Sequence, residues 1–175
     1  MKMINFFFLI LFAVSLSIAA QPAYARGRTH ALGAGVRYHA KPFVAETLPY
    51  DDGDLSYMLA YEYHEGPAFW QVAVDAANDL TGQTGVNRII TPQINLISSQ
   101  GIWQLGAGIL RSYVNKEETG NEWTSVYWQL IAGVSIPFSK IQFDVNAYYV
   151  LDKWGDIGEF KASDLEFAGR LTYFF

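Results

Sequence analysis

The chain has 175 residues, of which 51% are hydrophobic, 16% aromatic and 17% charged, and its formal net charge at pH 7 is -5. This length suits one domain, and the apolar content excludes an intrinsically disordered chain. Charged residues are fewer than the roughly 25% usual in soluble globular proteins, so part of the molecule is expected to face something other than water. An acidic balance without a Lys/Arg cluster excludes nucleic-acid binding, and the absence of cysteine excludes disulfides and thiolate metal sites.

The first 25 residues have the pattern of a secretory signal peptide. Lys2 precedes an apolar run from Ile4 to Ala20, and the small-residue sequence Ala23-Tyr24-Ala25 follows. A basic start, an apolar core and a small-x-small ending are typical of a cleaved export signal. The run is at the short end of the roughly 20 residues that a transmembrane helix needs. We therefore predict a signal peptide over residues 1–25 and a single mature domain over residues 26–175.

Eight segments of the mature chain alternate apolar and polar residues, which is typical of strands with one apolar face. In chain order they cover residues 32–39, 55–64, 70–75, 90–96, 103–109, 126–135, 141–149 and 165–175. The connections alternate between short ones (65–68, 98–101, 136–140) and long polar ones (near 40–54, 77–87, 112–123, 151–163). Short turns at one end and long loops at the other predict an antiparallel up-and-down meander.

Pro92 lies inside the fourth segment and is the one residue that fits its predicted strand poorly. Proline has no N–H to donate to a strand ladder. We therefore expect a bulge or a change of register at this position.

Alternation alone does not tell which face points outward, because a soluble lipocalin-like barrel gives the same pattern with its apolar face inward. Three features favour an outward apolar face. The polar set contains mostly Gly, Ala, Ser, Thr, Asn and Gln, whereas a water-facing surface is roughly 25–35% charged. The segments of about ten residues match a tilted membrane crossing. Tyr and Trp also gather near the strand ends of the apolar set, as in the aromatic girdles of membrane barrels. These residues are Tyr38, Tyr57, Tyr63, Trp70, Trp103, Tyr149 and Tyr173.

The chain ends in Leu171-Thr172-Tyr173-Phe174-Phe175, a terminal aromatic residue preceded by alternating apolar positions. With this ending the mature chain resembles the small eight-stranded outer-membrane β-barrel proteins of Gram-negative bacteria. The resemblance implies that Leu171, Tyr173 and Phe175 form the signal read by the barrel assembly machinery. We therefore expect an all-β protein, a monomeric eight-stranded antiparallel up-and-down transmembrane β-barrel, in the bacterial outer membrane.

The interior of an eight-stranded barrel is only wide enough to be filled by side chains. The polar face would line this lumen, where charged residues must pair, and inward glycines such as Gly33 and Gly35 would leave room for long side chains. The charged residues predicted to form this lumen network are Arg37, Glu62, Asp75, Asp144, Glu166 and Arg170. A plugged lumen predicts little or no conductance, with a narrow channel as the alternative.

Two arginines are expected at the outer rim, because Arg88 opens the fourth segment and Arg111 closes the fifth. A guanidinium group binds phosphate through two parallel hydrogen bonds, so both are candidate contacts for lipopolysaccharide phosphate. The alternative is that they only snorkel into water.

His39, Ser56 and Asp75 are expected near the outer end of the lumen, and their types suit a general base, a nucleophile and an orienting acid. On this basis the alternative function is a lipid A-modifying acyltransferase or deacylase. Any polar lumen offers some such trio, so we expect no catalytic activity. No spacing matches a calcium loop, so neither a metal ion nor a cofactor is expected. The predicted role is structural or interactive, through lipids, lipopolysaccharide and an extracellular partner that the sequence does not identify.

Overall fold

The computed structural model describes residues 29–40, 49–78, 86–116 and 120–175. The predicted signal peptide and most of the first and second long loops lie outside these residues. The described part contains ten strands and two short 3-10 helices. In chain order they are β1 (His30–Tyr38), β2 (Leu55–Glu65), β3 (Ala68–Asn78), β4 (Val86–Gln100), β5 (Trp103–Leu110), β6 (Tyr113–Lys116), β7 (Gly120–Trp123), β8 (Tyr127–Phe138), β9 (Ile141–Leu151), η1 (Trp154–Glu159), η2 (Ala162–Asp164) and β10 (Leu165–Phe174).

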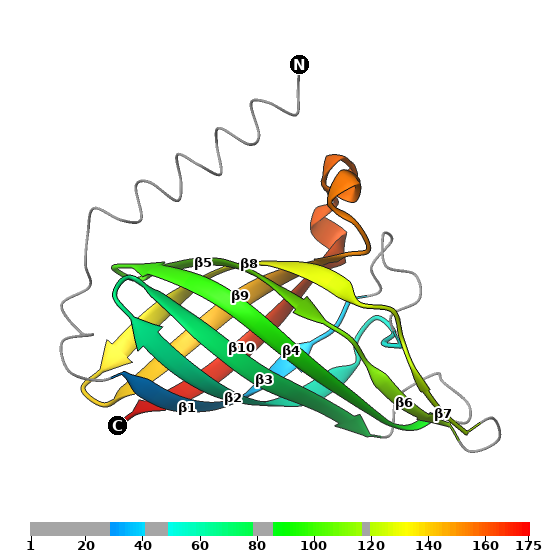
Figure 1. Ribbon diagram of the computed structural model, residues 1–175, viewed down its shortest axis with the longest axis horizontal. Helices are drawn as coiled ribbons and strands as arrows, with labels where there is room; N and C mark the ends of the chain where they lie inside the picture. The colour runs from blue at the N-terminus through cyan, green and yellow to red at the C-terminus, as the bar shows by residue number, and fades with distance from the viewer. Residues whose placement is uncertain (1–28, 41–48, 79–85, 117–119) are drawn as a thin grey trace.

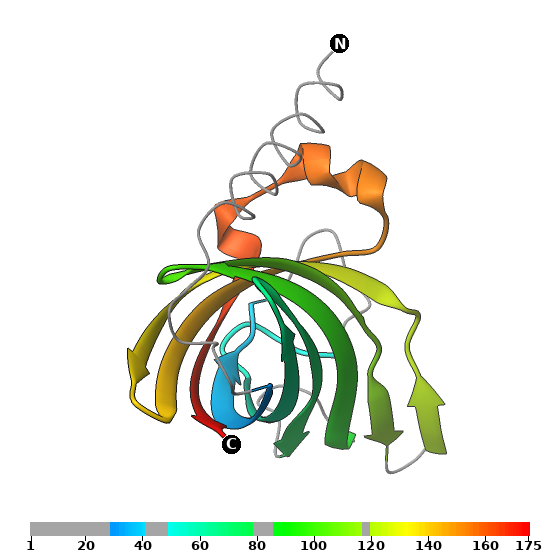
Figure 2. The same cartoon turned by 60° about the vertical axis from the view of Figure 1, so that its left-hand side comes forward.

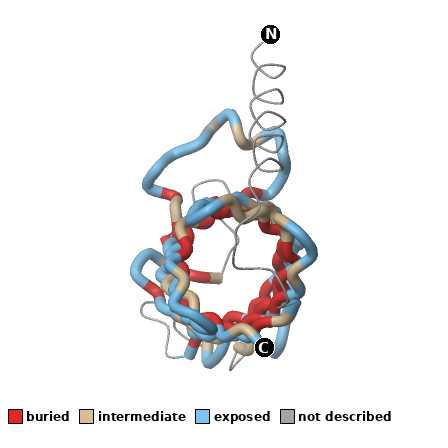
Figure 3. The backbone as a smooth tube through the Cα atoms, turned by 90° about the vertical axis from the view of Figure 1, so that its left-hand side faces the viewer, coloured by how far each residue is buried: buried red, intermediate tan, exposed pale blue. Residues whose placement is uncertain are grey.

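The strands form a closed antiparallel barrel (Figure 1; Figure 3 looks along it). Strands that are neighbours in sequence pair, except β5 with β6 and β7 with β8. β5 pairs with β8, β1 pairs with β10, and the pairing of β3 with β4 completes the ring. β5 and β6 pair with successive parts of β4, and β7 leads into β8. The ten strands therefore form eight positions around the wall, which we call staves. The predicted all-β, eight-stranded, antiparallel up-and-down barrel is therefore confirmed.

The two ends of the barrel differ. Three short turns, β2–β3, β4–β5 and β8–β9, lie with the C-terminus at one end, which we call the turn end (Figure 1). Gly66 and Gly101 have positive φ values of 67° and 61° in two of these turns, a conformation that favours glycine. The opposite end, the loop end, carries the four longer connections. This arrangement agrees with the alternation of short and long connections in the sequence.

The third long connection differs from its prediction as a loop over 112–123. β6 and β7 form a hairpin there, with Tyr113 opposite Trp123, and β6 continues the ladder of β4 from Ile90 to Val86. Arg111 therefore does not close the fifth stave, which continues beyond it toward the loop end. The sequence of this hairpin is mostly polar, and Val114 alone among its described residues is buried, against Tyr50, Ala77 and Ile89, so its strands show no apolar alternation.

Pro92 interrupts one ladder without changing its register, so the predicted bulge or register change at this position is wrong. Towards β3 the pairing continues through Val74 and Pro92 without a shift. On the other side only the Arg111 N–H bonds the Pro92 carbonyl, at 3.3 Å, because proline cannot return a bond. The stave breaks there into β5 and β6, and the one register shift of this ladder lies between Val86 and Arg88.

The two faces of the wall separate cleanly by residue type. Polar positions of the alternating segments point inward and are buried, whereas apolar positions such as Tyr57 (70% exposed) and Leu59 (63% exposed) point outward. Tyr149 is the exception among the predicted outward aromatics. It is buried because the ring of Phe160 lies 4.9 Å from its own ring.

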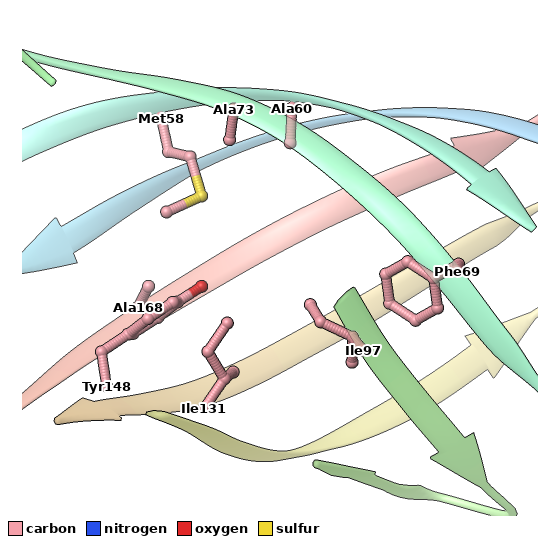
Figure 4. Packing of buried hydrophobic residues seen from close by; sticks show 8 residues of the cluster. All are labelled: Met58, Ala60, Phe69, Ala73, Ile97, Ile131, Tyr148 and Ala168. Atoms are coloured by element: carbon pink, nitrogen blue, oxygen red, sulfur yellow. The ribbon is translucent and has the colours of Figure 1, made fainter. Parts of the chain in front are cut away.

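The lumen also holds apolar side chains, shown in Figure 4. Met58, Phe69, Ile97, Ile131 and Tyr148 pack together there and fill space beside the polar groups. Gly33 has the role predicted for it, because an added Cβ would lie 2.9 Å from both Arg170 Cδ and Thr172 Oγ1. Among the residues that the structure describes, no helix is long and apolar enough to span a membrane.

Candidate functional site in the lumen

Arg37 on β1 is the centre of a buried ion-pair cluster near the loop end, which we call the loop-end cluster. Its Nη2 lies 2.6 Å from Glu166 Oε2 and its Nη1 lies 3.3 Å from Asp75 Oδ2. The guanidinium group also lies 4.2 Å from the ring centre of Tyr148. Glu166 and Asp75 come from β10 and β3, so one arginine links three staves.

Arg170 on β10 is the centre of a second cluster, the turn-end cluster. Its Nη2 lies 2.6 Å from Glu62 Oε1 and 3.0 Å from Asp144 Oδ2. Asp144 also accepts bonds from Thr172 at 3.0 Å and Ser135 at 2.7 Å. The six charged residues predicted for the lumen thus lie inside the barrel and pair in two sets of one arginine and two carboxylates.

A row of buried amides joins the two clusters. Gln93 donates to Asp75 at 3.0 Å, and Gln129 donates to both Gln93 and Asn95 at 2.6 Å. Asn95 donates to Gln71 at 2.9 Å, and Gln71 donates to Glu62 at 3.0 Å. The chain of hydrogen bonds runs without a break from one arginine to the other. Since unpaired polar groups in a dry interior are costly, this network fixes the lumen side chains in one arrangement.

Side chains fill the interior of the described barrel. A cavity of about 50 Å³ opens at the turn end beside His64, Gln104 and Gln142, and another of about 10 Å³ lies beside His39 and Tyr50. The larger volume accommodates a few water molecules at most. Neither cavity connects the two ends of the barrel.

The structure brings His39 and Ser56 together but gives them a different acid from the one predicted. His39 Nε2 lies 2.8 Å from Ser56 Oγ, and its Nδ1 lies 3.2 Å from Glu166 Oε1. Asp75 contacts Arg37 and Gln93 instead. The residue types match a serine, histidine and acid triad. All three side chains are buried, however, and the cavity beside His39 measures only about 10 Å³.

Tyr50 covers this trio from the loop end, whereas the sequence indicated it as one of several loop aromatics that contact a partner, lipid headgroups or other loops. Its ring stacks on His39 with centroids 3.6 Å apart and planes within 4°, and its hydroxyl group lies 2.7 Å from Thr91 Oγ1. Burial raises the pKa of the Tyr50 phenol. The sequence places this tyrosine in a long loop but carries no signal that it packs on His39, so only the structure shows that it covers the lumen residues.

The two rim arginines do not form one cluster. Arg88 donates to Asn78 at 2.9 Å, whereas Arg111 lies 4.5 Å from the ring centre of Trp123 and donates to the Thr124 carbonyl. Arg111 is opposite Pro92, four residues along β4 from Arg88, a separation of roughly 13 Å at about 3.3 Å per residue. Both are exposed on the outward face, at separate places.

The C-terminal residues predicted as an assembly signal lie at the turn end. Leu171 and Tyr173 point outward from β10 and are half exposed, and the Phe175 N–H bonds the His30 carbonyl at 3.0 Å. The three side chains therefore form one outward strip beside β1.

No family model matches the chain, and no curated protein matches it. The geometry of the barrel is therefore the basis for assigning a function. Within the described residues no group of three or more His, Cys, Asp or Glu side chains is placed to hold a metal ion.

Proposed function

We propose that the protein is an integral outer-membrane barrel with a filled lumen and a structural or interaction role. The distribution of side chains between the two faces carries the proposal. Along staves β1 to β5 and β8 to β10 the outward Asp, Glu, Lys and Arg side chains are Glu65, at a turn, and Arg88, at the loop end. The charged groups between these levels face the lumen. A water-soluble barrel has the opposite distribution, because its outer wall must be hydrated.

Aromatic bands support the same proposal. Tyr63, Trp70, Trp103 and Tyr173 lie on the outer wall near the turn end, and Tyr57 and Trp128 lie near the loop end. The outward positions between the bands are mainly aliphatic, such as Leu59 and Val72. Aromatic rings prefer the two interfaces of a bilayer, with aliphatic side chains in the hydrocarbon between them. Closure of the ring also pairs the backbone groups that lipid would leave unsatisfied.

Export through a cleaved signal peptide and delivery to the assembly machinery are parts of this proposal. The test is fractionation of cells that produce the full chain. We expect the protein in outer membranes, with residues 1–25 removed, and with faster gel mobility before heating than after it. Recovery of a folded, detergent-free chain from the periplasm would instead favour a soluble lipocalin-like barrel.

We propose that Arg88 and Arg111 each contact lipopolysaccharide phosphate separately, with side chains that also extend toward water. Their guanidinium groups are exposed and lie on the outward face toward the loop end, where phosphates of an outer leaflet would lie. Arg88→Ala with Arg111→Ala should lower the lipopolysaccharide that co-purifies with the barrel. Lys140→Ala, at the turn end, is the matched control. Equal lipopolysaccharide in all three preparations would refute the contact.

Neither catalysis nor conduction belongs to the proposed role. The contact of His39 with Ser56 is the observation that favours an acyltransferase or deacylase, but Tyr50 and the buried network leave no room for an acyl chain beside Ser56. The filled lumen likewise supports a barrier rather than a pore. Planar-bilayer recordings should show no stable conductance, and a reproducible open level would contradict the filled lumen.

A further inference from the structure

The connection between β9 and β10 leaves the barrel sideways. It contains η1 and η2, and Figure 2 shows this orange segment standing off the outside of the wall. The view along the barrel places it beyond the ring of staves (Figure 3). The β6–β7 hairpin, by contrast, extends the barrel along its length (Figure 1).

Aromatic contacts hold this segment against the outer wall rather than over the lumen. The rings of Trp154 and Trp128 lie 5.2 Å apart, and those of Phe160 and Tyr149 lie 4.9 Å apart. Trp128 and Tyr149 both occupy outward positions, on β8 and β9. The segment therefore begins at the loop-end aromatic band and lies outside it.

The segment is ordered locally and still leaves its aromatics exposed. The Asp156 carboxylate accepts a bond from the Lys153 N–H at 3.3 Å and lies 3.8 Å from the Lys153 ammonium group. Trp154 remains 44% exposed and Phe160 remains 55% exposed, although each packs against one ring of the wall. Large exposed rings beside charged groups suit the headgroup layer of a bilayer, which is apolar on one side and wet on the other.

We propose that residues 152–164 form a lateral anchor that lies in the headgroup layer of the outer leaflet, with Trp154 and Phe160 inserted among the lipids. The inference rests on the proposed membrane location, because a sideways segment at the loop end meets lipid only if the wall does. Its effect would be to fix the depth and rotation of β8, β9 and β10 in the membrane.

The absence of cysteine allows a direct test by site-specific labelling. Three single-cysteine chains, Phe160→Cys, Leu59→Cys and Asn121→Cys, are folded into phosphatidylcholine vesicles, checked for heat-modifiable mobility, and labelled with a polarity-sensitive fluorophore. Leu59 marks the middle of the wall, and Asn121 marks the exposed β6–β7 hairpin. Quenching is then measured with lipids that carry a spin label near the headgroup or deep in the acyl chain.

At position 160 we expect a loss of emission with the shallow label that exceeds the loss with the deep one. At position 59 the deep label should quench more strongly, and at position 121 neither should quench. If position 160 behaves like 121 while 59 is quenched, the anchor is wrong and the membrane barrel stands. If position 59 also escapes quenching, the proposed function itself fails.

A second variant does not depend on the label. Trp154→Ser with Phe160→Ser removes both exposed rings and leaves the lysines in place. In vesicles, trypsin should cut this variant at Lys153 or Lys161 faster than it cuts the wild-type chain. In detergent micelles, which lack an extended headgroup layer, the two rates should differ less. Equal rates in vesicles would overturn the anchor.

Discussion

Replacing Arg170 by methionine should destabilise the barrel strongly. Arg170 is 2% exposed, and its guanidinium group lies between two carboxylates, at 2.6 Å from Glu62 and 3.0 Å from Asp144. Methionine keeps much of the volume but removes the charge. Removing one partner of a buried ion pair costs about 3–5 kcal/mol, because the other charge stays buried without compensation. Asp144 keeps its bonds from Thr172 and Ser135, so we expect a loss within that range and not above it.

The assay is reversible urea unfolding of the refolded chain in detergent micelles, followed by gel mobility and tryptophan emission. The matched control is Arg88→Met, in which an exposed arginine loses one bond to Asn78, and its cost should stay within about 0.5 kcal/mol. Adding Glu62→Gln and Asp144→Asn to Arg170→Met should restore part of the loss, since neutral amides need no counter-charge. A cost below about 1 kcal/mol, or no recovery in the triple variant, would refute the pairing argument.

Three further outcomes follow from the lumen. In Gly33→Val the new Cβ would lie 2.9 Å from both Arg170 Cδ and Thr172 Oγ1. This overpacking should lower the free energy of unfolding by about 1–3 kcal/mol in the same urea assay. A cost no larger than that of Arg88→Met would contradict it. Burial raises the pKa of Tyr50, so the unfolded chain loses this proton first, and stability should fall as pH rises above about 10. Tyr50→Phe should reduce that fall, and unchanged pH dependence would show that the phenol is not buried. Ser56→Ala should leave the lipid A composition of producing cells as it is with the wild-type chain, by mass spectrometry, whereas loss of a modified species would establish catalysis.

Much of the wall was predictable because a closed eight-stranded barrel imposes one rule at every position. Its interior is narrow and its wall is one residue thick, so side chains alternate strictly between two environments. Gln93 and Ile94 obey this rule even next to Pro92. The β6–β7 hairpin escaped prediction because it extends beyond the barrel and buries Val114 alone among its described residues, which is too few to give an alternating pattern.

The pairing inside the lumen was less predictable, because it depends on register between staves distant in sequence. The composition of the lumen network follows from alternation, but the choice of Glu166 over Asp75 as the acid beside His39 does not. Tyr38 of β1 pairs with Phe167 of β10. Because the two strands are antiparallel, this register brings His39, which follows Tyr38, next to Glu166, which precedes Phe167. No local pattern encodes the register between the first and last staves.

The most direct test of the central claim is folding of the urea-unfolded mature chain with and without lipid vesicles. We predict that vesicles yield a heat-modifiable, protease-resistant barrel and that detergent-free buffer yields only aggregate, because the outward wall cannot be hydrated. A soluble, monomeric barrel with the same protease resistance in plain buffer would contradict the account.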